Sequence, residues 1–194
     1  AASEFTFIPP KSWKIAPPDK SLCVGFVGPS KGGFAPSINY REITLSSEGN
    51  TYIDRVIKRH NKGLDHTCSE VGMIQTPKGK AHLLQIDQKK QFGMVRIWQL
   101  VLLTEGKAHL LTCVDKKENF AGNQKHFLNS FSSIQFWNDI FEPTDQKKLF
   151  ENAFRLKKAK KVLKFLQKHH ASLGPFWQMR CLARLQSLGY LESS

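Results

Sequence analysis

Several features that would mark a particular class of protein are scarce or missing in this sequence. No run of about 18 apolar residues occurs, so a membrane-spanning helix is not predicted. The cysteines are few and scattered, without a Cys-x-x-Cys pair of the kind that paired-cysteine zinc sites use. We interpret them as buried free thiols, with one disulfide as the alternative if the protein is exported. They are Cys23, Cys68, Cys113 and Cys181.

Recognisable catalytic motifs are also missing. The sequence contains no Gly-x-Ser-x-Gly, His-Glu-x-x-His or Gly-x-Gly-x-x-Gly pattern. The loop 28–33 is rich in glycine and lysine, but it lacks the Gly-Lys-Ser/Thr that opens the helix of a phosphate-binding loop. His66-x-Cys68 and His169-His170 lack the further ligands of a closed zinc site. We therefore predict no catalytic residue, no metal and no cofactor.

Acidic residues are scarce relative to basic ones. The chain has 29 Lys and Arg against 16 Asp and Glu, a formal net charge of +13. Residues 143–194 hold 11 of the basic residues and only 3 of the acidic ones. A surplus of this kind suits an acidic protein, an anionic membrane surface or nucleic acid, and it does not choose among them.

The stretch Gly93 to Val114 carries the strongest structural pattern. Two runs rich in Val, Ile, Leu, Trp and Thr flank Glu105-Gly106, which predicts a β-hairpin with a tight turn. The first run is apolar on both faces, because Val101 and Leu103 alternate with Leu100 and Leu102. A strand of this kind needs cover on both sides. We predict a central strand with a layer above it and a layer below it.

Further strands and two helices are expected around this hairpin. The first helix should begin with a capping box of Thr51 and Asp54 and end near Gly63. The second should be capped by Asp115, with Phe120, Phe127, Leu128 and Phe131 at helical spacing. The predicted strands are 5–8, 22–27, 37–45, 66–76 and 81–87, and an extended segment at 130–137 closes the unit.

The hexapeptide Gly-Lys-Ala-His-Leu-Leu occurs twice, at 79–84 and at 106–111. Two copies are too few for a repeat fold, and we interpret them as two strands flanking one central strand. His82 and His109 should then share a face of the sheet about 10 Å apart, too far to bind one metal ion. A structural role for both is the preferred interpretation. A pocket that placed either histidine beside a carboxylate would favour the alternative of an unrecognised metal-dependent or hydrolytic enzyme.

Several segments are similar to signatures of the PsbP-like family. The opening Phe5-Thr6-Phe7-Ile8-Pro9 with Trp13 resembles the start of the family's sequences, an aromatic residue followed by Pro and Trp. Residues 34–40 resemble the family's strand in which Asn is followed by alternating apolar residues. Gly106 to Thr112 is similar to a Gly-x-x-Tyr-x-Leu-Thr strand, with His109 in place of the aromatic residue. Phe120, Phe127 and the run 130–133 resemble the closing helix. The resemblance covers residues 5–137.

This resemblance implies an α+β fold, an α/β/α sandwich around a central antiparallel sheet, over residues 1–142. It also implies a non-enzymatic accessory or binding protein that docks on a protein partner or complex. An exported or periplasmic location is favoured by the same resemblance, with a cytoplasmic one as the alternative. No functional residue is carried over from the family.

Residues 143–194 are predicted to form a separate helical hairpin. Leu156, Ala159, Leu163 and Leu166 make an apolar stripe, and Pro175 starts a second helix that ends at Gly189. The other side of the first helix is basic, and it is our candidate binding face. An acidic protein, an anionic membrane and nucleic acid are the possible partners; Phe150, Phe154 and Phe165 would assist membrane binding. The candidate residues are Lys157, Lys160, Lys161, Lys164 and Lys168.

Overall fold

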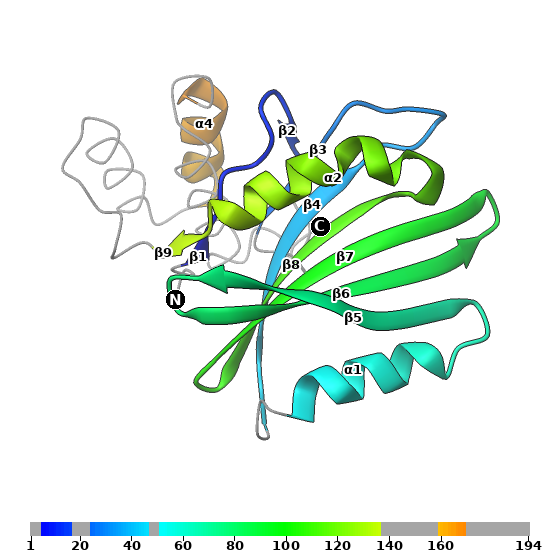
Figure 1. Cartoon of the computed structure of the whole chain (residues 1–194). Coiled ribbons are helices and arrows are strands. Elements are labelled where there is room, and N and C mark those ends of the chain that lie inside the picture. The colour runs from blue at the N-terminus through cyan, green and yellow to red at the C-terminus, as the bar shows by residue number, and fades with distance from the viewer. Residues whose placement is uncertain (1–4, 17–23, 47–50, 137–158, 170–194) are drawn as a thin grey trace.

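A computed structural model describes residues 5–16, 24–46, 51–136 and 159–169. Its centre is a seven-stranded antiparallel sheet of order β2-β3-β4-β8-β7-β6-β5 (Figure 1). The strands are β2 (Lys14–Ile15), β3 (Val24–Val27), β4 (Ser37–Thr44), β5 (His66–Thr76), β6 (Gly79–Lys90), β7 (Gly93–Thr104) and β8 (Lys107–Lys116). The α+β fold and the central antiparallel sheet are as predicted.

Strands β7 and β8 form the predicted hairpin. They pair from Val95 opposite Lys116 to Thr104 opposite Lys107. Gly106 lies in the turn with φ of 70°. This left-handed backbone conformation is sterically unfavourable for residues that have a Cβ. Because β6 pairs with the other edge of β7, the strand is central, as its apolar faces predict.

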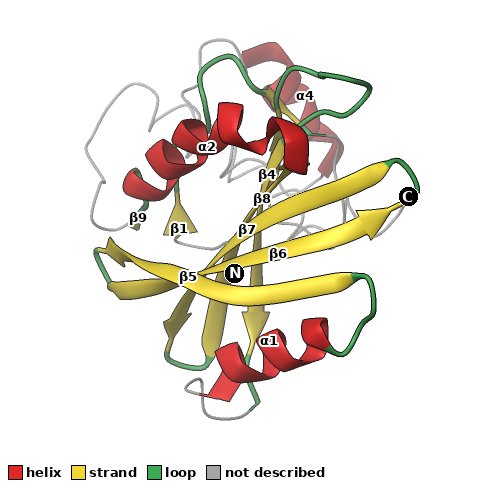
Figure 2. Cartoon of the chain, turned by 45° about the vertical axis from the view of Figure 1, so that its right-hand side comes forward, coloured by secondary structure: helices red, strands yellow, loops and turns green. Residues whose placement is uncertain are grey.

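Helices cover both faces of the sheet (Figure 2). Helix α2 (Lys117–Ser132) packs Phe120, Phe127 and Phe131 against Leu100 and Leu102 of β7. On the other face lies α1 (Tyr52–Asn61), which buries apolar side chains against Val101 of β7 and Leu110 of β8. Each apolar face of the central strand therefore belongs to a different core cluster.

The helix starts differ from the predictions. Thr51 is at the N-cap of α1, but its side chain makes no capping hydrogen bond, so the predicted capping box does not form. Asp115 is the penultimate residue of β8 and not a cap, because the strand runs on until Lys116. Its carboxylate is buried, and it accepts hydrogen bonds from the Lys116 backbone N–H and the Asn123 amide. Leu128 is exposed and does not belong to the buried stripe of α2.

The N-terminal segment closes the fold outside the main sheet. Strand β1 (Phe5–Thr6) pairs with β9 (Gln135–Phe136) in a separate two-stranded sheet. The backbone of Ile8 is held by the hydroxyls of Ser130 and Ser133, at 2.9 Å and 2.7 Å. The first strand thus secures the end of α2. The sequence led us to expect that it begins the main sheet, and it lies outside that sheet.

Strand β5 is the last strand on its side of the sheet and contains a β-bulge. Glu70 pairs with Leu84 and Gly72 with Leu83, so Val71 is an extra residue. Beyond the bulge, the side chains of β5 point to the opposite faces of the sheet from those that strict alternation would give. Cys68 therefore belongs to the core on the α1 side, whereas Ile74, six residues later, packs on the α2 side.

The prediction of buried free cysteines is confirmed within the described residues. Cys68 and Cys113 are buried free thiols, whereas Cys23 and Cys181 lie outside that part of the chain. None of the described helices has the length and apolar character needed to cross a membrane. The domain boundary at 142/143 lies outside the described residues, as does the hairpin of 143–194 apart from α4 (Ala159–His169).

Candidate functional site

Helix α4 carries four of the five predicted binding lysines. Lys160, Lys161, Lys164 and Lys168 are exposed, and Lys157 lies outside the described residues. At 100° per residue the four span an arc of about 100° on the helix surface. No acidic residue occurs between 159 and 169 to neutralise them. The described part of this face is therefore a uniformly cationic surface.

The opposite side of α4 is attached to the sandwich. Val162 is completely buried in the core cluster on the α2 side of the sheet, and Phe165 packs against the same cluster. Neither residue belongs to the predicted stripe, and the Leu163 and Leu166 side chains are not described. This contact holds the helix so that its lysines face away from the core.

A second candidate site is a buried polar network around His109. His109 is 7% exposed, and its Nδ1 lies 2.7 Å from the Tyr40 hydroxyl, while its Nε2 lies 3.0 Å from the Thr104 hydroxyl. The Tyr40 hydroxyl also donates to Glu42 at 3.2 Å. Phe5 stacks on the Tyr40 ring at a centroid distance of 4.5 Å. The network thus joins β4 to the β7–β8 turn beneath an aromatic cover.

The hydrogen bonds fix the tautomer of His109. Tyr40 has one hydroxyl proton, and donating it to Glu42 leaves the Tyr40 oxygen to accept from His109 Nδ1–H. Nε2 then accepts the proton of the Thr104 hydroxyl. Burial lowers the pKa of His109, and the charges of Lys107 and Lys78 lower it further against the opposing effect of Glu42. The neutral imidazole is therefore the form that this arrangement stabilises.

The hydrogen bonds of this network connect β4, β7 and β8. Thr104, His109 and Tyr40 follow the order of a nucleophile, a base and an orienting group, but the imidazole is enclosed by Phe5 and Phe136. Both of its nitrogens are used within the network, which leaves neither for a substrate or metal. Among the described residues, no group of three or more metal-ligating side chains comes together.

His82 and His109 lie on opposite faces of the sheet, which corrects the prediction that they share one. Val101 of β7 pairs with His82 on one side and with Leu110, not His109, on the other. The two copies of the hexapeptide are therefore offset by one residue, and an offset of one reverses the facing of every side chain. His82 contacts Glu70 at the partly exposed edge of the α1 face, with 2.5 Å between Nδ1 and Oε1.

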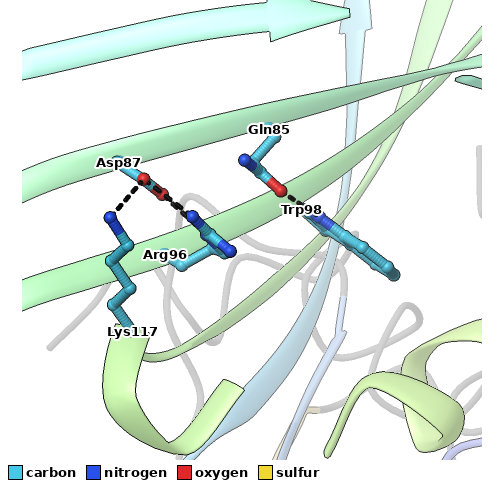
Figure 3. Close-up of polar contacts among 5 residues, drawn as sticks. All are labelled: Gln85, Asp87, Arg96, Trp98 and Lys117. Atoms are coloured by element: carbon cyan, nitrogen blue, oxygen red, sulfur yellow. Dashed lines mark hydrogen bonds and ion pairs between the residues drawn. The ribbon is translucent and has the colours of Figure 1, made fainter. Parts of the chain in front are cut away.

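A third polar cluster lies between the sheet and the start of α2. Asp87 of β6 accepts two hydrogen bonds from Arg96 of β7, at 2.9 Å and 3.0 Å, and Lys117 approaches the same carboxylate at 3.3 Å (Figure 3). Beside it, the Trp98 indole donates to Gln85 at 3.1 Å. These residues were not predicted from the sequence. Asp87 and Arg96 are nine residues apart, and the register of the β6–β7 hairpin makes them direct neighbours.

The Asp87 cluster attaches the start of α2 to strands β6 and β7. The Arg96 hydrogen bonds are the main cause that lowers the pKa of Asp87, and Lys117 adds to this effect. The Arg96 guanidinium also lies over the Phe120 ring, 5.9 Å from its centroid. The cluster therefore joins two strands to the first turns of α2, and all three of its charged groups are used in doing so.

No model of a known protein family matches the sequence, and no curated protein matches it. Solved structures, however, share the fold. LpqN of Mycobacterium tuberculosis, which is involved in cell envelope biogenesis, is similar with a TM-score of 0.53 and 11% identity, over 68% of this chain and 82% of LpqN. PA94 from Pseudomonas aeruginosa, a protein of unknown function, gives 0.50 and 12%, over 73% of this chain and 99% of PA94.

Cyanobacterial PsbP from Synechocystis sp. PCC 6803 is similar at a TM-score of 0.42 and 14% identity, over 69% of this chain and 82% of that protein. At such identities a likeness concerns the fold. LpqN and PA94 have the same arrangement of helices around an antiparallel sheet. The chain thus has the PsbP-like fold that its sequence resembles.

Proposed function

We propose that this protein is a non-enzymatic accessory protein that docks on an acidic protein partner through the lysine face of α4. The observation that carries the proposal is the way α4 is held. Its buried Val162 fixes the helix to the sandwich, and Lys160, Lys161, Lys164 and Lys168 are presented to solvent. A rigidly held row of like charges attracts a surface of opposite charge and orients it during association.

The apolar side of α4 favours a protein partner over a membrane. An interfacial helix places its apolar face among the lipid acyl chains. In α4, Val162 and Phe165 are already packed against the core, so they do not serve that purpose while the helix is docked. Phe165, which the sequence offered as a membrane contact, has a structural role instead.

The composition of the face also favours a protein over nucleic acid. Single-stranded nucleic acids are held by aromatic stacking combined with a basic groove, and the planar guanidinium of Arg suits nucleic-acid recognition better than the ammonium group of Lys. The exposed cations of α4 are all lysines, whose charge attracts phosphates without reading a sequence.

The non-enzymatic part of the proposal rests on the two polar networks. His109 is buried and Asp87 is partly buried, and both make hydrogen bonds with neighbouring residues. The fold shared with LpqN, a protein involved in cell envelope biogenesis, supports an accessory role of this kind.

A quadruple variant tests the docking face. Proteins that crosslink to the wild type in its native cells are identified by mass spectrometry and compared with those of K160Q/K161Q/K164Q/K168Q. The matched control, K58Q/K62Q/K89Q/K90Q, removes the same charge from exposed lysines elsewhere. We expect the control to retain an acidic partner that the α4 variant loses, with binding that weakens as salt is added.

Two results would contradict the proposal. One is an α4 variant that keeps its partners while the control loses them. The other is binding of the purified wild type to RNA, DNA or phosphatidylserine vesicles that requires the α4 lysines when no protein partner does. Turnover of a small molecule at His109, abolished by H109Q without loss of folding, would contradict the non-enzymatic part.

A further inference from the structure

A cavity lies between α1 and the end of β4, on the face of the sheet opposite the cluster that holds α4. Its volume is about 270 Å³, just below the roughly 300 Å³ at which small-molecule sites begin. Ile43, Leu45 and Val56 give it an apolar wall, and the polar atoms come from two hydroxyl residues, a tyrosine and two arginines. These are Thr44, Ser46, Tyr52, Arg55 and Arg59.

Two arginines of α1 line the cavity, and a third arginine lies near Tyr52 on β4. Arg55 and Arg59 are four residues apart on α1, so they project from the same side of the helix. Arg41 lies on β4, two residues before Ile43 and therefore on the same face of the strand. All three positive charges act on the Tyr52 hydroxyl: burial raises the pKa of Tyr52, and each arginine lowers it.

These guanidinium groups have no opposite charge among the described residues. No carboxylate of the described residues lines the cavity, and the ion pairs given for those residues do not include Arg41, Arg55 or Arg59. Arg96 shows the contrast, because it has Asp87 at 2.9 Å. Arg55 and Arg59 at the cavity and Arg41 near it on β4 repel one another, and a bound anion would remove that cost.

We propose that this cavity binds a phosphate group, carried by a small molecule or by a lipid headgroup. The planar forks of Arg55 and Arg59 match the geometry of phosphate oxygens. A phosphate monoester with nearly two negative charges balances the two guanidinium groups of the cavity better than a carboxylate with one. The hydroxyl of Ser46 supplies a further donor, and the apolar wall accepts the organic part of the ligand.

NMR titration of the full-length protein tests the site. Inorganic phosphate, glycerol 3-phosphate and acetate are added at matched ionic strength, and amide shifts of Thr44, Tyr52 and Arg55 are followed. We expect saturable shifts with the two phosphates and weaker ones with acetate. The variant R55Q/R59Q should weaken phosphate binding roughly tenfold or more, because hydrogen bonds to charged groups are lost.

Lys58 provides the matched control. It is exposed on the same helix but does not line the cavity, so K58Q should leave the affinity for phosphate within about twofold. Because Arg55 and Arg59 are exposed, R55Q/R59Q should keep the melting temperature of the wild type.

Flotation with phosphatidylcholine vesicles, with and without phosphatidic acid, distinguishes the sources. Binding to phosphatidic acid that needs Arg55 and Arg59 assigns a lipid headgroup, and saturable glycerol 3-phosphate binding without vesicle binding assigns a small molecule. Shifts that stay linear, that chloride reproduces, or that K58Q reduces as much as R55Q/R59Q would overturn the proposal. The docking of a protein on α4 does not enter this test.

Discussion

His109 is a buried base between two hydroxyl groups, and its environment couples folding to pH. The pKa of this imidazole is lowered by burial in the folded state, so the unfolded chain binds its proton more readily. The stability that His109 contributes is therefore present above the unfolded value of 6.5 and is lost as the pH falls below it toward the folded value.

We expect H109Q, which keeps a donor and an acceptor but does not titrate, to lose less stability than the wild type as the pH falls from about 8 to about 5. Urea unfolding at each pH measures the free energies. The dependence of the free energy of unfolding on pH should be weaker in H109Q but still present, because burial also lowers the pKa of His60. Parallel curves for the two proteins would show that His109 is not held neutral.

Asp87 is the residue on which the attachment of α2 to the sheet depends. Removing its charge leaves Arg96 and Lys117 without their partner, which should lower the free energy of unfolding of D87N by about 1–3 kcal/mol at neutral pH. Because the pKa of Asp87 is lowered, this advantage is present above 3.8 and lost as the pH falls through the folded value. Chemical denaturation at two pH values measures both effects.

Asp65 is the control for this substitution. It is exposed in the turn before β5, so D65N should change the free energy of unfolding by less than about 0.5 kcal/mol. Equal effects of D65N and D87N would mean that net charge, and not the ion pair, determines the result.

At the level of elements, two glycines make a matched pair. Neither Gly106 nor Gly122 has another atom within 4 Å of an added Cβ, so only the backbone decides the outcome. In the β7–β8 turn, φ of 70° makes G106A unfavourable by about 1 kcal/mol. In the interior of α2, G122A should be favourable by about 0.5–1 kcal/mol.

Thermal unfolding of the two variants should therefore shift in opposite directions. If both are destabilising, the assignment of Gly122 to a regular helix interior is wrong. If both are neutral, the turn at Gly106 tolerates a side chain and does not fix the hairpin.

The elements that could be predicted from sequence are those whose patterns are local. The hairpin at 93–114 and the helix with Phe120, Phe127 and Phe131 follow from alternation and helical spacing. What depends on register could not be predicted. The offset that separates His82 from His109 and the pairing of Asp87 with Arg96 are both set by strand alignment, on which a local pattern has no bearing.

Residues at element ends were the hardest to assign. Asp115 has the sequence context of a helix cap, yet β8 continues through it and uses its carboxylate inside the fold. The arginines at and near the cavity were not predicted for a related reason. Arg41 lies on β4 and Arg55 on α1, and their spacing along the sequence does not indicate that the two elements bring them together. Exposure of the α4 lysines agrees with the predicted helix face, whereas the anchoring by Val162 was missed.

For the whole molecule, the position of α4 depends on Val162. This side chain is fully buried, so V162A should remove about 1–3 kcal/mol of stability and loosen the helix. Hydrogen exchange of the α4 amides should accelerate more than that of β7. K161A, at the exposed neighbouring position, should leave exchange and stability nearly unchanged. Identical exchange in V162A and K161A would contradict the anchoring of α4.

Basic residues of the described chain lie on opposite sides of the sheet. The α4 lysines lie on the side of α2, and the cavity arginines lie on the side of α1. The two proposed surfaces therefore lie apart, and we expect a substitution in one to leave binding at the other unchanged.

The bulge in β5 has a consequence for how molecules of this protein meet. Among the described strands, β5 has a partner only on its β6 side, and a regular outer strand is a template for a strand from another molecule. The extra residue Val71 interrupts the two-residue repeat near the middle of β5. An incoming regular strand would match one half of this edge but not both, so the bulge disfavours edge-to-edge pairing between sheets of different molecules.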